Sequence, residues 1–391
     1  MKARNLRLQK SKKEALTGYL TDQRDGLYIL LKNLVEIQSG SRNKAGVDAV
    51  GHAIAREMES FGFECSRLSQ TEVGDHIIAR SMPHEPGAPH LLITGHMDTV
   101  FPEDTHFRKY VETPEYCKGP GVADMKGGLV VGMFALKALK ALDLMPELPI
   151  TFFFNSDEEI GSPTSREAIA GEAESAVAGF VLEAGGLDGE VVSGRKGNLA
   201  VRLNVEGNAG HAAFAGPDKA SAVLELAHKT LAIEALNHPE RGITANVGTF
   251  NGGIGRNVIA QHACADVDFR FLKPEDEAQV KSDLDRIVNE NRVPGTCTTI
   301  HPLSGRPPMP QTLANHDLYR RTAAVAKELG IAVKEELRQG VSDANIIAGT
   351  GLPVVDGLGP CGAKDHSEDE YILKESLWER TLLFAALLSE F

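Results

Sequence analysis

Side chains that bind metals or carry protons follow apolar segments at several places in this chain. The segment LLITGHMDTVFP, residues 91–102, ends its apolar run with His96 and Asp98. Residues two apart on a strand share one face, and a metal-binding histidine usually donates its other ring N–H to a carboxylate. The pair therefore suits a metal ligand and the acid that orients it. A capped histidine of the core is the alternative.

Further acids lie in two glycine-containing loops. In GPGVADMKGG, Asp124 precedes an apolar helix, where it is either a ligand or the N-cap of that helix. In NSDEEIGSP, directly after ITFFF, Glu158 and Glu159 are adjacent and repel each other unless a cation or a proton neutralises one. One of them could bind a metal while the other acts as general base. A solvated acidic loop is the alternative.

Two later residues complete the set. Glu183 follows the apolar strand of FVLEAGG, and His366 lies in the acidic loop GAKDHSEDEY. Taken singly, each is explained as a polar residue of the surface or core. Taken together, two histidines and at least three carboxylates suit zinc, or less selectively cobalt or manganese. An aspartate bridging two metals about 3.5–4 Å apart would support hydrolysis by a metal-activated water.

The elements that must position these residues alternate between helix and strand. Helical spacing covers 24–38 and 46–61, and strands are expected at HIIARS, PHLLITGHMD, LPITFFFNSDEE and AGFVLEAGG. The alternation predicts an α/β fold with a mostly parallel sheet flanked by helices. Three of these strands end in acids or histidine, at the sheet edge where open α/β folds bind ligands.

From about Leu199 the pattern changes to that of a half-exposed antiparallel strand, in which alternate residues are apolar. The order that follows is β-α-β-β-α-β, which predicts a compact ferredoxin-like insertion. Helix and strand signals of the first type then resume. We therefore predict a domain built from residues 1–197 and 304–391, interrupted by an inserted domain at 198–303.

Composition excludes several classes of function. The formal charge is −13 without a basic face, which argues against nucleic acid or an anionic membrane as a partner. The start of the chain does not have the pattern of a secretory signal, and no apolar run of about 18 residues predicts a membrane span. Five scattered cysteines without a C-x-x-C pair indicate reduced thiols and a cytoplasmic location. A zinc role for Cys117 or Cys361 is an alternative that this pattern disfavours.

Six strings occur in an order and spacing that resemble one family: GHMDTV, GVADMKGG, SDEEIGS, LEAGG, GNAGHAA and DHSEDEY. The chain is similar, from about residue 25 to its end, to the co-catalytic zinc metallopeptidases and aminoacylases. This family includes glutamate carboxypeptidase, acetylornithine deacetylase and succinyl-diaminopimelate desuccinylase. The resemblance implies the family's zinc-peptidase catalytic domain and, in the insertion, its dimerisation domain.

Carried over by position, the resemblance implies two zinc ions per subunit, with cobalt or manganese as possible substitutes. One would be held by His96 and Glu183 and the other by Glu159 and His366, with Asp124 bridging them. Asp98 would orient His96, and Glu158 would be the general base. The resemblance also implies a cis peptide bond between Asp124 and Met125. The resemblance further implies that His211 would reach across a homodimer to stabilise the oxyanion. The implied substrate-binding residues are Asn257, Arg270, Arg306 and Gly340, and Ser342 and Asp343 would lie near the pocket.

A guanidinium suits bidentate recognition of a carboxylate, although a structural ion pair is the alternative for each arginine. We therefore expect hydrolysis of an amide bond next to a free α-carboxylate, in a small peptide or an N-acyl amino acid. An exopeptidase similar to glutamate carboxypeptidase is the first hypothesis, and an N-acyl amino acid deacylase is the second. A non-catalytic binding protein would be expected to lack a ligand or the base, and none is lacking. A dehydrogenase fails because no G-x-G-x-x-G follows the first strand.

Overall fold

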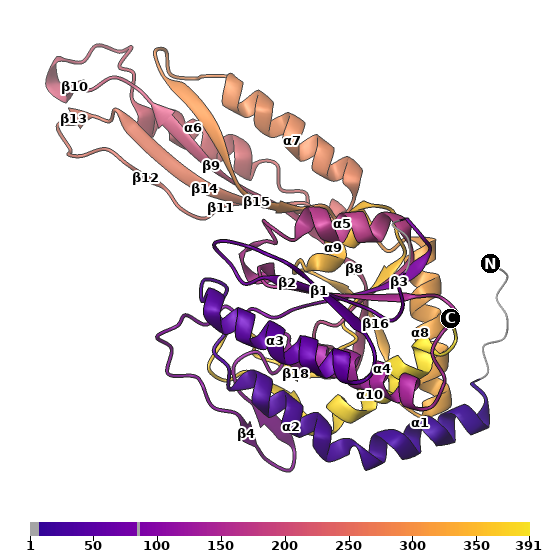
Figure 1. Ribbon diagram of the computed structural model, residues 1–391. Coiled ribbons are helices and arrows are strands. Elements are labelled where there is room, and N and C mark those ends of the chain that lie inside the picture. The colour runs from indigo at the N-terminus through magenta and orange to yellow at the C-terminus, as the bar shows by residue number, and fades with distance from the viewer. Residues whose placement is uncertain (1–7, 84–86) are drawn as a thin grey trace. The chain divides into compact units, whose positions relative to one another are not determined.

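The computed structural model describes residues 8–83 and 87–391, and the chain divides into two compact units (Figure 1). The larger unit combines Met1–Gly194, Gln311–Arg338 and Ser342–Phe391. The inserted unit comprises Arg195–Pro310 with Gln339–Val341. The larger unit is therefore assembled from both ends of the chain. That these units are a catalytic and a dimerisation domain stays a prediction.

A six-stranded sheet forms the centre of the larger unit. Its order is β1-β2-β6-β3-β7-β17, and the bounds are Glu64–Leu68, His76–Arg80, Ile150–Asn155, His90–His96, Ala176–Val181 and Val354–Val355. The strands β6, β3, β7 and β17 are parallel neighbours, and β1 and β2 extend the sheet in antiparallel fashion. All residues of β3 and β6 are buried, as their apolar runs predict for strands covered on both faces. The predicted α/β fold class is confirmed.

Helices surround this sheet. They are α1 Lys10–Asp22, α2 Arg24–Val35, α3 Lys44–Ser60, α4 Lys126–Ala141, α5 Arg166–Ser175, α8 Leu313–Leu329, α9 Asp343–Gly349 and α10 Lys374–Leu388. The apolar helix α4 packs against α10 and is buried over most of its length. Two small sheets complete the unit: β18-β19-β5-β4 (Gly362–Ala363, Tyr371–Leu373, Tyr116–Lys118, Val111–Glu112) and β16-β8 (Lys334–Arg338, Glu190–Arg195).

The inserted unit has the predicted β-α-β-β-α-β order. Its main elements are β9 Gly197–Glu206, α6 Ala222–Glu234, β11 Thr244–Val247, β14 His262–Phe271, α7 Pro274–Asn289 and β15 Cys297–Arg306. The strands form an antiparallel sheet in the order β11-β14-β9-β15, which is the ferredoxin-like order. Of the alternating apolar residues of β9, Val201, Leu203 and Val205 are buried and Leu199 is half-buried. Short strands β10 (Gly210–His211), β12 (Asn251–Gly252) and β13 (Val258–Ile259) are added to this pattern.

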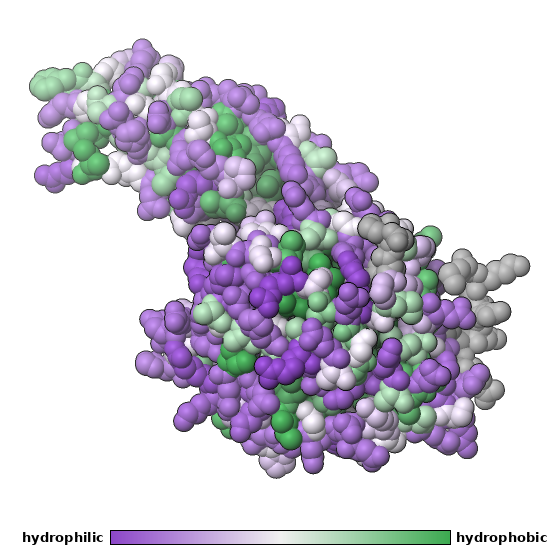
Figure 2. Space-filling view, in the orientation of Figure 1, coloured by the Kyte–Doolittle hydropathy of each residue, from purple (hydrophilic) through white to green (hydrophobic). Residues whose placement is uncertain are grey.

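Several large apolar side chains of the inserted unit are exposed, and Phe214 and Ile254 are the most exposed of them. Phe214 is 87% exposed and Ile254 is 91% exposed. Figure 2 shows hydrophobic atoms at the end of this unit, where Figure 1 places β10 and β13.

Among the described residues, no helix has the length and hydropathy that crossing a membrane requires. All five cysteines are free thiols.

Candidate metal centre

Three neighbouring parallel strands deliver the chemistry-bearing residues to one edge of the central sheet. β3 ends at His96, β6 leads into Glu158 and Glu159, and β7 is followed by Glu183. The register pairs His96 with Asn155, the last residue of β6. The acidic loop therefore begins beside the histidine, at the carboxyl ends of the strands where α/β folds bind ligands.

Asp124 lies between the two predicted histidine ligands. Its Oδ1 is 2.9 Å from Nε2 of His96, and its Oδ2 is 3.1 Å from Nε2 of His366. His366 Nε2 is also 3.3 Å from Oε2 of Glu159, and His96 Nε2 is 3.6 Å from Oε1 of Glu183. The structure thus brings all five predicted metal ligands together, with Asp124 placed to be shared.

The turn that carries Asp124 has a backbone conformation that requires glycine at two positions. Met125 is the N-cap residue of α4 and this helix has no side-chain cap, so Asp124 does not act as the capping alternative requires. The predicted cis peptide bond between Asp124 and Met125 is confirmed. Gly121 has a φ of +77°, a conformation that favours glycine, and a Cβ on Gly128 would lie 1.8 Å from the carbonyl oxygen of Leu182. Glycine therefore lets α4 begin directly against the end of β7.

Asp98 joins the two loops that follow β3 and β6. The Ser41 hydroxyl donates to its Oδ2 at 2.6 Å. The backbone N–H groups of Glu158 and Glu159 donate to Oδ1 and Oδ2, each at 3.2 Å. Nδ1 of His96 is 3.0 Å from the carbonyl oxygen of Asp98 and 3.4 Å from its carboxylate. The carbonyl is thus the nearer partner of the ring, and the carboxylate holds the acidic loop.

The electrostatics of the cluster favour a bound cation. Burial, reinforced by the negative charge of Asp124, raises the pKa of Glu159 to about 8 and holds that of Glu183 well above its usual range. Hydrogen bonds to Asp124 and then Glu159 raise the pKa of His366 to about 11. Although burial opposes it, hydrogen bonding to the two histidines holds the pKa of Asp124 below its usual range. Burial therefore disfavours the charged forms of Glu159 and Glu183 unless a cation or a proton neutralises them.

The donor set fits a divalent metal. The buried Oε1 of Glu159 has no hydrogen-bond partner within the described part of the chain, which is costly unless another group binds it. Ligand atoms of His96, Asp124 and Glu159 all lie within 4.8 Å of one another, as do those of Asp124, Asp365 and His366. Imidazole nitrogen with carboxylate oxygen is a donor set typical of zinc. His96 is 1% exposed and His366 57% exposed, so the two halves of the cluster differ in access to solvent.

Sequence reasoning missed three residues of this region. Asp365 lies beside the cluster, Ser41 holds Asp98, and Glu370 binds the backbone around Asp124. Asp365 and Glu370 are acids in the same loop as His366, and that nearness was the available signal. Ser41 lies 57 residues from its partner, and no local pattern marks it.

The predicted substrate and oxyanion residues His211, Asn257, Arg270, Arg306 and Gly340 belong to the inserted unit. Their roles beside the metal ligands stay predictions. His211 is exposed, and its Nδ1 accepts the N–H of Ala213 at 3.2 Å. Arg270 pairs with Asp268 at 2.8 Å, which is the structural alternative considered for this residue. Arg306 is buried, and Asn257 and Gly340 are exposed.

Ser342 and Asp343 lie in the larger unit at the start of α9. The Ser342 side chain accepts the N–H of Ala344 as the N-cap and donates its hydroxyl to Asp356. The carboxylate of Asp343 accepts hydrogen bonds from Asn155 at 2.7 Å and from Ser162 at 2.5 Å. Asp343 therefore ties α9 to the last residue of β6 and to the loop that follows it.

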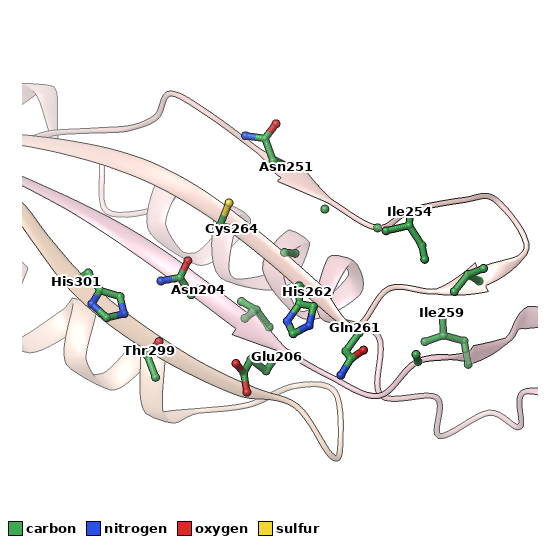
Figure 3. A pocket seen from close by; sticks show the side chains of 16 residues that line it. Asn204, Glu206, Asn251, Ile254, Ile259, Gln261, His262, Cys264, Thr299 and His301 are labelled. Carbon is green, nitrogen blue, oxygen red and sulfur yellow. The ribbon is translucent and has the colours of Figure 1, made fainter.

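A separate groove of about 650 Å³ lies on the inserted unit. Figure 3 shows polar side chains of three adjacent strands along it: Asn204 and Glu206 from β9, His262 and Cys264 from β14, and Thr299 and His301 from β15. None of the predicted site residues lines this groove. The candidate metal centre is thus a different place in the chain.

Comparison with known proteins shows which sequence family the chain matches and which solved structures share its fold. Residues 92–390 match the sequence profile of peptidase family M20/M25/M40. Carboxypeptidase G2 of Pseudomonas sp. (strain RS-16) is 29% identical over 374 residues, covering 94% of this chain and 89% of that protein. Succinyl-diaminopimelate desuccinylase of Hydrogenovibrio crunogenus is 25% identical over 378 residues, covering 91% and 96%.

Solved structures share the fold at lower identity. The aminopeptidase PepT of Bacillus cereus has a TM-score of 0.76 at 24% identity, covering 94% of this chain and 98% of that one. The metallo-carboxypeptidase Sso-CP2 of Sulfolobus solfataricus has a TM-score of 0.69 at 18% identity, covering 93% and 98%. At these identities the similarity to solved structures shows the fold alone. A function has to be inferred from the residues of the site.

Proposed function

This chain belongs to peptidase family M20/M25/M40 and is a metal-dependent hydrolase, and we propose that it cleaves an amide bond next to a free α-carboxylate. The proposed activity is that of a glutamate carboxypeptidase-like exopeptidase with two zinc ions per chain. The observation that carries the proposal is the convergence of two histidines and three carboxylates, with both oxygens of Asp124 directed at the histidines.

Within this proposal, His96 and Glu183 would hold one zinc, Glu159 and His366 would hold the other, and Asp124 would contribute to both. Zinc bound there would supply Lewis-acid activation of a water and of the scissile carbonyl. Glu158 takes a proton from the attacking water at its carboxylate and later gives a proton to the leaving nitrogen. The support for this role is that Asp98 fixes the backbone of Glu158 beside the ligand Glu159. His211 donates to the oxyanion from the partner of a homodimer.

The free carboxylate of the substrate is assigned to the inserted unit. Arg306 and Arg270 would bind it, with Asn257 and Gly340 completing the subsite. The similarity to carboxypeptidase G2 supports a substrate with a terminal carboxylate. The ion pair of Arg270 with Asp268 would have to open or be shared for this residue to bind substrate.

The second candidate function is deacylation of an N-acyl amino acid. The similarity to succinyl-diaminopimelate desuccinylase favours it, because removing a succinyl group from an amine is also the hydrolysis of an amide bond. The metal centre is the same for both reactions, so the two differ in what the substrate pocket accepts. A homodimer is part of this proposal, and a cytoplasmic location is supported by the five free cysteines.

The proposal is tested by assaying zinc-loaded protein on three substrate classes: dipeptides, N-acyl amino acids and amides of glutamate. We expect zinc-dependent hydrolysis that requires a free α-carboxylate, so that the carboxamide of the best substrate is cleaved at least tenfold more slowly. Cleavage of N-acyl amino acids alone would favour the deacylase. Absence of activity on all three classes with zinc or cobalt bound would contradict both.

A further inference from the structure

We propose that Glu370 is a positioning residue that holds the Asp124 loop in place for metal binding by accepting three backbone hydrogen bonds. The side chain of Glu370 is 1% exposed. Its Oε1 accepts the N–H groups of Ala123 at 2.8 Å and Asp124 at 3.0 Å, and its Oε2 accepts the N–H of Gly121 at 2.9 Å. This inference rests on the proposed metal centre.

The three donors lie in the turn between β5 and α4. Gly121 has a positive φ, and its carbonyl oxygen accepts the N–H of Lys126 at 2.7 Å. The N–H of Val122 donates to the carbonyl oxygen of Gly119 instead, so the donors are not consecutive, but all three point at one carboxylate. Backbone N–H groups that converge in this way bind an anionic oxygen pair. One of the three donors is the N–H of Asp124 itself. The direction in which Asp124 leaves the turn, and with it the position of its carboxylate between the histidines, is therefore set by contact with Glu370.

Glu370 also belongs to the loop that carries His366. Its N–H donates to the carbonyl oxygen of Ser367 at 3.1 Å, which closes a turn directly after the histidine. The next residue, Tyr371, begins β19 and pairs with Lys118 at the end of β5. The two loops that supply Asp124 and His366 are thus joined twice, by the β19–β5 pairing and by the Glu370 carboxylate.

This arrangement matters more for His366 than for His96. His96 is the last residue of a buried central strand, so its position is fixed by the sheet. His366 is 57% exposed and has a φ of +59° in a loop. Its distance to Asp124 depends on the loop contacts that Glu370 supplies. Weakening those contacts should therefore loosen the metal position that His366 and Glu159 share more than the position at His96.

Glu370→Gln is the direct test because it keeps the size of the side chain. A glutamine has one acceptor oxygen, so at least one of the three N–H groups would face an NH₂ group instead. Removal of a group that orients metal ligands typically lowers metal affinity by about 10–100-fold. We expect this loss for one of two zinc equivalents in calorimetric titration. We also expect the visible spectrum of the cobalt-substituted protein to change in band position or intensity.

Glu225→Gln is the matched control. Glu225 is a fully buried carboxylate of the inserted unit that accepts the N–H groups of Arg292 and Val293. Glu225 also pairs with Lys229 at 2.9 Å. Its substitution weakens a buried carboxylate acceptor in the unit that contains none of the five predicted metal ligands. Zinc affinity and the cobalt spectrum should be unchanged. A purely structural role of Glu370 would make both variants alike.

Glu370→Asp covers the case in which Glu370→Gln fails to fold. It keeps the charge and both oxygens but is one methylene shorter, and we expect zinc affinity between those of the glutamine variant and the parent protein. Unchanged zinc affinity and an unchanged cobalt spectrum, in whichever of the two variants folds, would overturn the role of Glu370 alone. A parent protein that binds no zinc would instead overturn the proposed function and this inference with it.

Discussion

Replacing Asp98 by asparagine separates two roles that this residue could have. The carboxylate accepts hydrogen bonds from the Ser41 hydroxyl and from the N–H groups of Glu158 and Glu159. His96, by contrast, has the Asp98 carbonyl oxygen as its nearer ring partner, and the substitution leaves that oxygen in place. We therefore expect Asp98→Asn to disturb the acidic loop more than the histidine.

The size of the effect follows from the bonds removed. An asparagine keeps one acceptor oxygen, so at least one N–H of the acidic loop loses its partner. A hydrogen bond to a charged group contributes about 1.5–3 kcal/mol, so the free energy of unfolding should fall by about that amount. Displacement of Glu158 by about 1 Å would lower kcat by about 100-fold. Zinc affinity should fall by less than about tenfold, the lower end of the loss expected when an orienting partner is removed.

The chain's single tryptophan makes the stability measurement specific. Trp378 lies in α10 of the larger unit, so its fluorescence during urea unfolding follows that unit. Ser41→Ala is the control, because it removes one bond to Asp98 but leaves both loop N–H groups bound. Its kcat should stay within a few fold of the parent value. If the Asp98→Asn variant keeps its unfolding free energy and kcat, or mainly loses zinc affinity, then the Asp98 carboxylate does not hold the acidic loop.

Two further predictions concern protons. Glu158→Gln should lower kcat by about 10²–10⁴-fold while both zinc ions remain bound, and persistent turnover would exclude Glu158 as the base. In the metal-free protein, Glu159 has a pKa raised to about 8, so the folded chain holds a proton that the unfolded chain releases above its ordinary pKa of 4.5. Its stability should therefore fall between about pH 5 and 8, and the raised pKa of His366 acts in the same direction above 6.5. A thermal midpoint of the metal-free protein that rises over this interval would contradict the assignment.

Much of the fold could be predicted because the strands that support the site are strongly apolar. β3 and β6 are buried along their full length, and their runs of apolar residues predict this burial from the sequence. The helix α1 was not predicted, since only Leu16 and Leu20 of its thirteen residues are buried. It packs mainly against α10, which comes from the other end of the chain. The small sheet β18-β19-β5-β4 was also missed, because strands of two or three residues carry no periodicity.

The metal ligands were easier to predict from the sequence than the contacts that hold them in place. His96, Glu159 and Glu183 follow strand ends that any parallel sheet brings together. The contact of Glu370 with the Asp124 loop spans 246 residues, and the polar groups involved are backbone N–H groups that every sequence contains. The same holds for the carbonyl oxygen of Asp98 beside His96. Such contacts depend on the exact path of loops, which sequence patterns do not determine.

Calorimetric titration of the metal-free protein and its Asp124→Asn variant with zinc tests whether two metal positions share Asp124. We expect two zinc equivalents per chain for the parent protein. For the variant we expect weaker binding at both positions, because Asp124 faces His96 with one oxygen and His366 with the other. A parent protein that binds no zinc, or a variant that binds two equivalents with unchanged affinity, would contradict the shared metal centre.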